Sequence, residues 1–174
     1  MRSVITGYRR VVAGGLAVVM GCVMAASPGL AAAKAKSQVC ASDRELTALN
    51  TRVLQTELMV AALSCNEKAR YNTFVNTYQS LLTTQGQSLQ ALFKRVHGGK
   101  STTRLNAFIT KLANDSSQQV RTRGDDYCVF AVELFDETMA ASPREWGRLA
   151  SKPWIVSRHG FQPCVAQAGG KQTG

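Results

Sequence analysis

Apolar residues recur every three or four positions along most of the chain, which is the spacing of amphipathic helices. The first run begins after a capping box formed by Ser42 and Glu45, so we expect a helix to start there. Its apolar positions are Leu46, Leu49, Val53, Leu54, Val60 and Leu63. A second run covers residues 71–96 and stops at Gly98 and Gly99, a typical helix terminus.

The boundary between these two runs is less marked. Only Ser64, Cys65 and Asn66 separate them, and the apolar phase could continue through this segment without a break. An uninterrupted helix over residues 43–97 would be about 80 Å long, which is improbable for a small domain. We therefore predict a tight turn at Cys65.

A third run follows the glycine pair and continues to Phe135. Gly124 interrupts it, so the pattern allows one helix with a weak point or two helices. A second capping box, Ser142 with Glu145, predicts a short fourth helix that ends near Ala150.

The segment beyond Pro153 is predicted to run extended and to anchor on the helices. The expected anchors are Trp154, Ile155, Val156 and Phe161. With no strand pattern or internal repeat, the prediction is an all-α fold: an antiparallel bundle of three long helices and a short fourth, spanning residues 42–165.

The first 33 residues have the features of an export signal. A basic stretch with Arg9 and Arg10 precedes an apolar run, and small residues at Ala31 and Ala33 suit cleavage after Ala33. The apolar run of about 16 residues is short for a membrane anchor, which needs about 20. An alternative is a lipoprotein modified at Cys22. We expect a flexible leader over residues 34–41 and a flexible tail over residues 166–174.

Cysteine usage supports export. Cleavage would remove Cys22 and leave an even set of four, Cys40, Cys65, Cys128 and Cys164. An even count in an exported chain predicts disulfides, and no pair has the close spacing of a zinc site.

The antiparallel arrangement of the helices predicts which cysteines pair. It places Cys128 level with residue 71, close to Cys65, whereas Cys40 lies about 30 Å away along the bundle axis. Because disulfides need Cα atoms within about 7 Å, we predict Cys65–Cys128 and Cys40–Cys164.

Composition and charge exclude several classes of protein. The chain of 174 residues has an ordinary apolar content, which excludes a collagen, a long disordered tail and a multi-spanning membrane protein. Its net charge is +10, of which Arg2, Arg9 and Arg10 contribute three units. Nucleic acid is not expected as a partner outside the cytoplasm, and the sequence has no basic-aromatic binding module.

The charges are expected to separate along the bundle. Lys94, Arg95, Lys100 and Arg104 gather around the glycine pair, with Lys111 further along, and form a candidate binding tip. A solvated acidic face is expected at the opposite end, made of Asp125, Asp126, Glu133, Asp136 and Glu137. The tip could contact an envelope protein or an anionic envelope surface, or could serve solubility alone.

Residues 71–93 contain no charged side chain. The stretch is either a solvated face built from amides and hydroxyls, or a face covered by the bundle or a partner. Gly86 is expected to face Ala113, where two small residues would allow close helix packing.

The candidate chemistry is sparse. Arg158, His159 and Gly160 form the tripeptide of histidine phosphatases, but no α/β domain follows to supply further phosphate ligands, so we expect His159 to be a surface or tail residue. His97 is isolated at a helix end. We assign no catalytic residue, no metal and no cofactor.

The predicted function is therefore binding or assembly in the cell envelope by an exported, non-enzymatic protein, periplasmic or secreted. One alternative is a hydrolytic enzyme that uses Arg158 and His159. Another is a stress-protective folding factor that uses the uncharged helix face.

Overall fold

The computed structural model describes residues 39–164. The predicted signal peptide, the leader up to residue 38, Cys22 and the predicted tail lie outside the described residues. Within them the chain is all-α, as predicted, apart from two strands of two residues each. The elements in order are β1 (Cys40–Ala41), α1 (Asp43–Ser64), α2 (Lys68–Thr77), α3 (Gln79–His97), the 3-10 helix η1 (Gly98–Lys100), α4 (Ser101–Arg123), α5 (Asp125–Ala140), α6 (Trp146–Ala150), α7 (Pro153–His159) and β2 (Gln162–Pro163).

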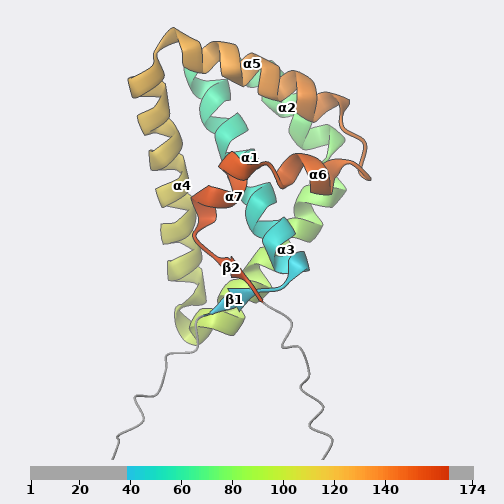
Figure 1. Cartoon of the computed structure of the whole chain (residues 1–174), viewed down its shortest axis with the longest axis vertical. Helices are drawn as coiled ribbons and strands as arrows, with labels where there is room; N and C mark the ends of the chain where they lie inside the picture. The colour runs from blue at the N-terminus through green and yellow to red at the C-terminus, as the bar shows by residue number, and fades with distance from the viewer. Residues whose placement is uncertain (1–38, 165–174) are drawn as a thin grey trace, which may run out of the picture. The chain divides into compact units, whose positions relative to one another are not determined.

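Helix α1 forms the centre of the bundle, with α3 and α4 alongside it, α5 across one end, and α6 and α7 crossing over it (Figure 1). Its buried side chains include Leu49, Leu54 and Leu58, but also polar ones such as Thr51 and Glu57. A helix surrounded in this way buries more than one face, which is why polar side chains are enclosed. Leu63, the last apolar position of the first run, is 66% exposed in the last turn of α1.

The predicted turn at Cys65 is confirmed, with Asn66 in the left-handed region at φ 61°. The second run, however, is two helices. Tyr78 leaves helical geometry between α2 and α3, and its hydroxyl lies 2.7 Å from the carbonyl oxygens of both Thr138 and Ala141. Its ring packs against Trp146 at 5.0 Å between centroids. The bend therefore turns a buried phenol toward the end of α5.

Gly124 separates α4 from α5, which decides between the two interpretations of the third run. Its φ of +56° and ψ of −130° belong to a region that residues with a Cβ rarely adopt. The chain changes direction at this glycine, so α4 and α5 are separate helices and α5 lies across the end of the bundle (Figure 1).

The C-terminal segment departs from the prediction. Residues 153–159 form helix α7 rather than an extended segment, with Pro153 in the first turn and Gly160 in the left-handed conformation after the last residue. Ile155 is fully buried, whereas Val156 is 41% exposed. In the fourth helix, Glu145 accepts hydrogen bonds from Ser142 as the capping box requires, but α6 starts only at Trp146 after a turn.

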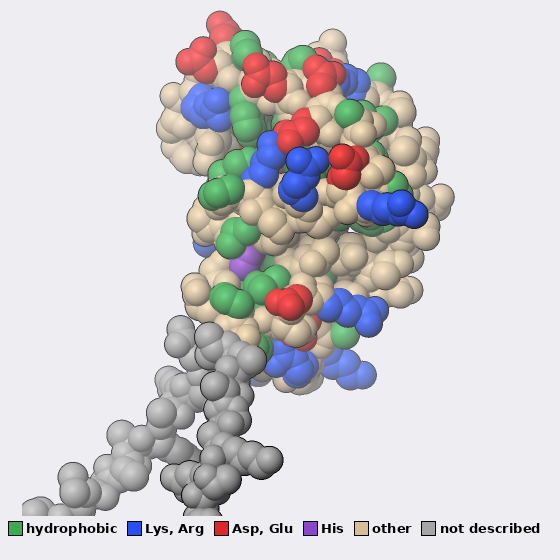
Figure 2. Space-filling model, turned by 45° about the vertical axis from the view of Figure 1, so that its right-hand side comes forward, with side chains coloured by type: hydrophobic (Ala, Val, Ile, Leu, Met, Phe, Trp, Pro, Cys, Tyr) green, Lys and Arg blue, Asp and Glu red, His purple; other side chains and the backbone are tan. Residues whose placement is uncertain are grey.

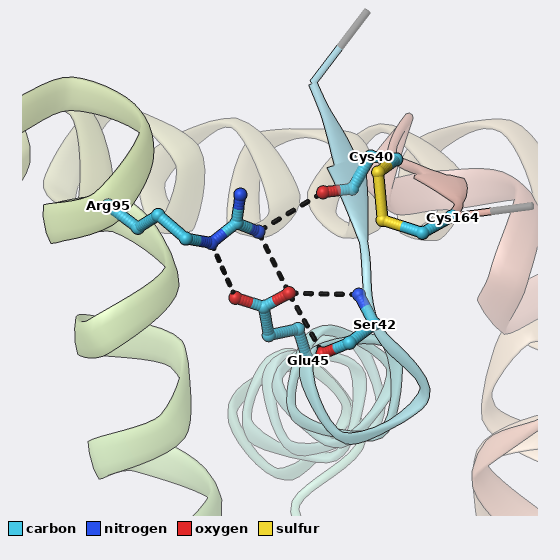
Figure 3. Close-up of a disulfide and its surroundings, with 5 residues drawn as sticks. All are labelled: Cys40, Ser42, Glu45, Arg95 and Cys164. Carbon is cyan, nitrogen blue, oxygen red and sulfur yellow. Dashed lines mark hydrogen bonds and ion pairs between the residues drawn. A yellow bond between two sulfur atoms is a disulfide. The ribbon is translucent and has the colours of Figure 1, made fainter. Parts of the chain in front are cut away.

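Two disulfides join Cys40 to Cys164 and Cys65 to Cys128, the same pairs that the helix geometry predicts. At the first, β1 and β2 pair in parallel, with Cys40 opposite Gln162. Figure 3 shows this disulfide next to a carboxylate that links Ser42 to Arg95. The C-terminal segment therefore runs back to the start of the fold.

That carboxylate belongs to Glu45. It accepts hydrogen bonds from the backbone amide of Ser42 at 2.8 Å and from Nη2 of Arg95 at 2.8 Å. Burial alone would raise the pKa of Glu45, but the hydrogen bonds from Ser42 and Arg95 outweigh it and hold the pKa below its ordinary value. The capping box is thus joined to the last turn of α3.

Candidate functional site

The basic tip lies where α3 ends and α4 begins, at the lower edge of the face in Figure 2. Lys94, Lys100 and Arg104 are exposed and form no ion pair within residues 39–164. Gly98 lies between them with a φ of +54° and open space where a side chain would stand. These three cations are therefore free to meet an external anion.

Arg95 and Lys111 differ from these three. Arg95 holds both oxygens of Glu45 and also donates to the carbonyl of Cys40 at 3.1 Å. Lys111 pairs with Asp115 one turn along α4. Arg95 therefore holds the start of the fold in place. The other three predicted tip residues remain available for binding.

The acidic residues gather at the other end of the bundle, on α5. All five are exposed, as expected of a solvated face: Asp125, Asp126, Glu133, Asp136 and Glu137. Asp136 pairs with Arg70 and Glu137 pairs with Lys152. Among the described residues, no three His, Cys, Asp or Glu side chains converge as a metal site would require.

The uncharged stretch of α2 and α3 is covered by the bundle on one side only. Phe74 and Leu89 are buried, whereas Asn76, Thr83 and Gln87 are exposed. The opposite face of the stretch is therefore solvated in the described chain.

The predicted approach of Gly86 to Ala113 is wrong. A Cβ at Gly86 would come closest to Nη2 of Arg52, at 4.0 Å, so this glycine faces α1 rather than α4. The hairpin register fixes which residues of α3 and α4 lie level with each other, but not which side of α3 faces α4, and Gly86 lies on the side toward α1.

The expectation that His159 is a surface or tail residue is also wrong. It is 6% exposed at the end of α7, and its Nδ1 accepts a hydrogen bond from the amide of Phe161 at 3.1 Å. Burial lowers the pKa of His159, which favours the neutral ring. A buried neutral imidazole is not presented to a phosphoryl donor, as the tripeptide of histidine phosphatases would require.

Its neighbour Arg158 reaches a buried carboxylate in α1. Nη1 of Arg158 donates to Oε2 of Glu57 at 2.6 Å, and Nη2 donates to Ser116 at 2.9 Å. Ser116 and Tyr127 each donate a hydroxyl to the same carboxylate, at 2.6 and 2.8 Å. Burial, together with the neighbouring Glu57 carboxylate, raises the pKa of Tyr127, so the phenol stays protonated and donates.

Glu57 thereby joins four helices through one carboxylate: α1, α4, α5 and α7. Its three donors satisfy it, which a buried charge requires. Sequence reasoning missed this centre, although one signal was present. Glu57 falls four residues after Val53 and three before Val60, so a carboxylate occupies the apolar face of the first helix.

Within residues 39–164, no helix combines the length and the apolar character needed to cross a bilayer. Comparison with protein-family models, with curated proteins and with solved structures finds no match for this chain. The two disulfides suggest an oxidising location outside the cytoplasm.

Proposed function

We propose that this chain is an exported, non-enzymatic helical protein that binds an anionic surface of the cell envelope through its basic tip. The proposal is based on three cations, Lys94, Lys100 and Arg104. Their side chains are exposed and form no ion pair in the described part of the chain. Glu45, the carboxylate of the capping box, is bonded to Arg95 and not to any of these three. The tip therefore keeps its positive charge.

Local stability does not account for these cations. Lys100 and Arg104 lie at the start of α4, where positive charge opposes the helix dipole. Their placement costs helix stability and favours an anionic contact. Each Lys or Arg near an anionic membrane contributes about 1 kcal/mol of binding free energy.

Vesicle co-sedimentation tests the proposal, with vesicles of mixed phosphatidylglycerol and phosphatidylethanolamine compared with phosphatidylcholine. The tip variant carries Lys94→Glu, Lys100→Glu and Arg104→Glu and leaves Arg95 intact. A matched control carries Lys68→Glu, Arg121→Glu and Arg144→Glu, which remove the same charge from exposed sites away from the tip. We expect the tip variant to lose about a hundredfold in affinity for the anionic vesicles, and the control much less.

Equal losses in the two variants would mean that net charge, not the tip, drives association. Unchanged binding of the tip variant, with circular dichroism showing a folded protein, would refute the proposal.

Export itself is tested on protein expressed with its own N-terminal segment. Mass spectrometry of the product in the periplasm or medium should find Lys34 as the first residue. A product retained with residues 1–33, or lipidated at Cys22, would require a different envelope location.

A further inference from the structure

An open cavity of about 340 Å³ lies beside the Glu57–Arg158 pair, where α4, α5 and α7 meet. Figure 1 shows α7 lying between α4 and α1 at this level. The cavity is lined by two aromatic rings, two guanidinium groups, an amide, a hydroxyl and one carboxylate: Phe130, Trp154, Arg123, Arg158, Gln119, Ser157 and Glu57. We propose that it binds a small organic anion that carries a flat ring.

The aromatic wall provides the contact for the ring. Phe130 of α5 and Trp154 of α7 meet edge to face, with centroids 5.7 Å apart and planes at 80°. Both side chains are partly buried and pack against the main core, so the wall is held in place before a ligand arrives. Preformed aromatic surfaces bind flat rings at a low cost in conformational entropy.

The charges select an anion. Glu57 is the single carboxylate of the lining, and Arg158, Ser116 and Tyr127 already satisfy it. Arg123 forms no ion pair in the described part of the chain; its guanidinium lies 4.8 Å from the centroid of Phe130. With Arg158 balanced by Glu57, the charge of Arg123 leaves the cavity positive.

The two guanidinium groups also have donors to offer. Arg158 uses Nη1 once and Nη2 twice, so its Nε–H and one Nη1–H have no acceptor among residues 39–164. Arg123 makes one long contact, 3.4 Å, to the carbonyl of Asp126. A carboxylate or sulfonate between the two side chains would receive charge-assisted hydrogen bonds from both. An organic cation would instead face two positive groups.

Isothermal titration of the full-length protein with 2-naphthoate, and with the neutral 2-naphthamide, tests the proposal. We expect saturable binding of the naphthoate and at least about tenfold weaker binding of the amide, because charged hydrogen bonds are the stronger ones. Arg123→Gln should lower the affinity for naphthoate by about tenfold or more. Arg121→Gln removes the same charge from the same turn of α4, outside the cavity lining, and should leave the affinity unchanged.

The two tryptophans show where the naphthoate binds. Trp154 lines the cavity, whereas Trp146 is 2% exposed and donates its indole N–H to Thr51. In proton–nitrogen NMR spectra, naphthoate should shift the indole signal of Trp154 and leave that of Trp146 in place. Absent binding, equal affinity for the amide, tighter binding of 2-naphthylmethylammonium, or equal effects of the two arginine variants would each overturn the proposal. These outcomes are independent of vesicle binding at the tip.

Discussion

Oε2 of Glu57 lies 2.6 Å from Nη1 of Arg158, although 101 residues separate the two in sequence. The side chain of Glu57 is 2% exposed and that of Arg158 is 12% exposed, so both charges are largely withdrawn from water. Removal of one partner from a buried pair of this kind strongly destabilises the fold, because the other charge stays buried without its counter-ion. The contact therefore joins the centre of the bundle to its C-terminal helix.

Arg158→Met should lower the free energy of unfolding by about 3–5 kcal/mol, because it leaves the Glu57 carboxylate buried without its cation. The double variant Glu57→Leu with Arg158→Met should lose less than the sum of the two single variants. Urea unfolding followed by circular dichroism measures all three. Single variants that cost under about 1 kcal/mol would show that water solvates the pair.

The Cys40–Cys164 disulfide is predicted to hold α7 in place. Replacing both cysteines with Ser should lower stability by about 2–5 kcal/mol, much as removal of Cys65–Cys128 would, since the cost depends only weakly on loop length. Only the first change should accelerate hydrogen exchange at Ile155 and His159. Equal exchange in both variants would indicate that packing alone secures α7.

Gly124 and Gly99 form a matched pair for testing backbone strain. A Cβ at either position meets nothing within 4 Å, but only Gly124 has a positive φ, +56°. Gly124→Ala should therefore cost about 1–2 kcal/mol, while Gly99→Ala should change stability by less than about 0.5 kcal/mol. Thermal unfolding checks both, and equal effects would contradict a conformational origin.

The pKa of Glu45 predicts an acid-dependent loss of stability. Since the folded pKa lies below the unfolded value, the carboxylate stabilises the fold above the unfolded pKa of about 4.3, and the gain is lost as the pH falls through the folded pKa. Glu45→Gln should be less stable than the wild type at pH 7 and nearly equal to it at pH 2. Urea midpoints at the two pH values test this, and a constant difference would exclude the linkage.

Local sequence signals predicted much of this fold. The capping box at Ser42 and the turn at Cys65 depend on residues close together in the chain, and the cysteine pairs followed from helix lengths. The bend at Tyr78 could not be predicted in this way, because the hydrogen bond made there by the Tyr78 hydroxyl joins it to the end of α5, 60 residues further on.

The Glu57 centre was missed for a related reason. Arg158 drew attention as part of a tripeptide, but its role depends on a carboxylate in the first helix and on Ser116 and Tyr127 in two others. Helix α7 was not predicted, because a short run of apolar residues after a proline fits an extended segment as well as a helix of seven residues. For the basic tip, the sequence pattern correctly predicted exposed cations. The hydrogen bond from Arg95 to Glu45 could not be predicted, because the two residues lie on different helices and meet only in the tertiary structure.

The bond between Cys40 and Cys164 closes the described fold into a covalent ring, with the two Cα atoms 4.8 Å apart. A single cut of the backbone anywhere between them leaves the two fragments attached to each other. Proteolysis at an exposed turn, such as the one at Gly99, would therefore nick the molecule without releasing a piece of it. A protein outside the cytoplasm is exposed to proteases in a place where no new chains are synthesised. There, the Cys40–Cys164 disulfide would keep the protein in one piece after a single cleavage.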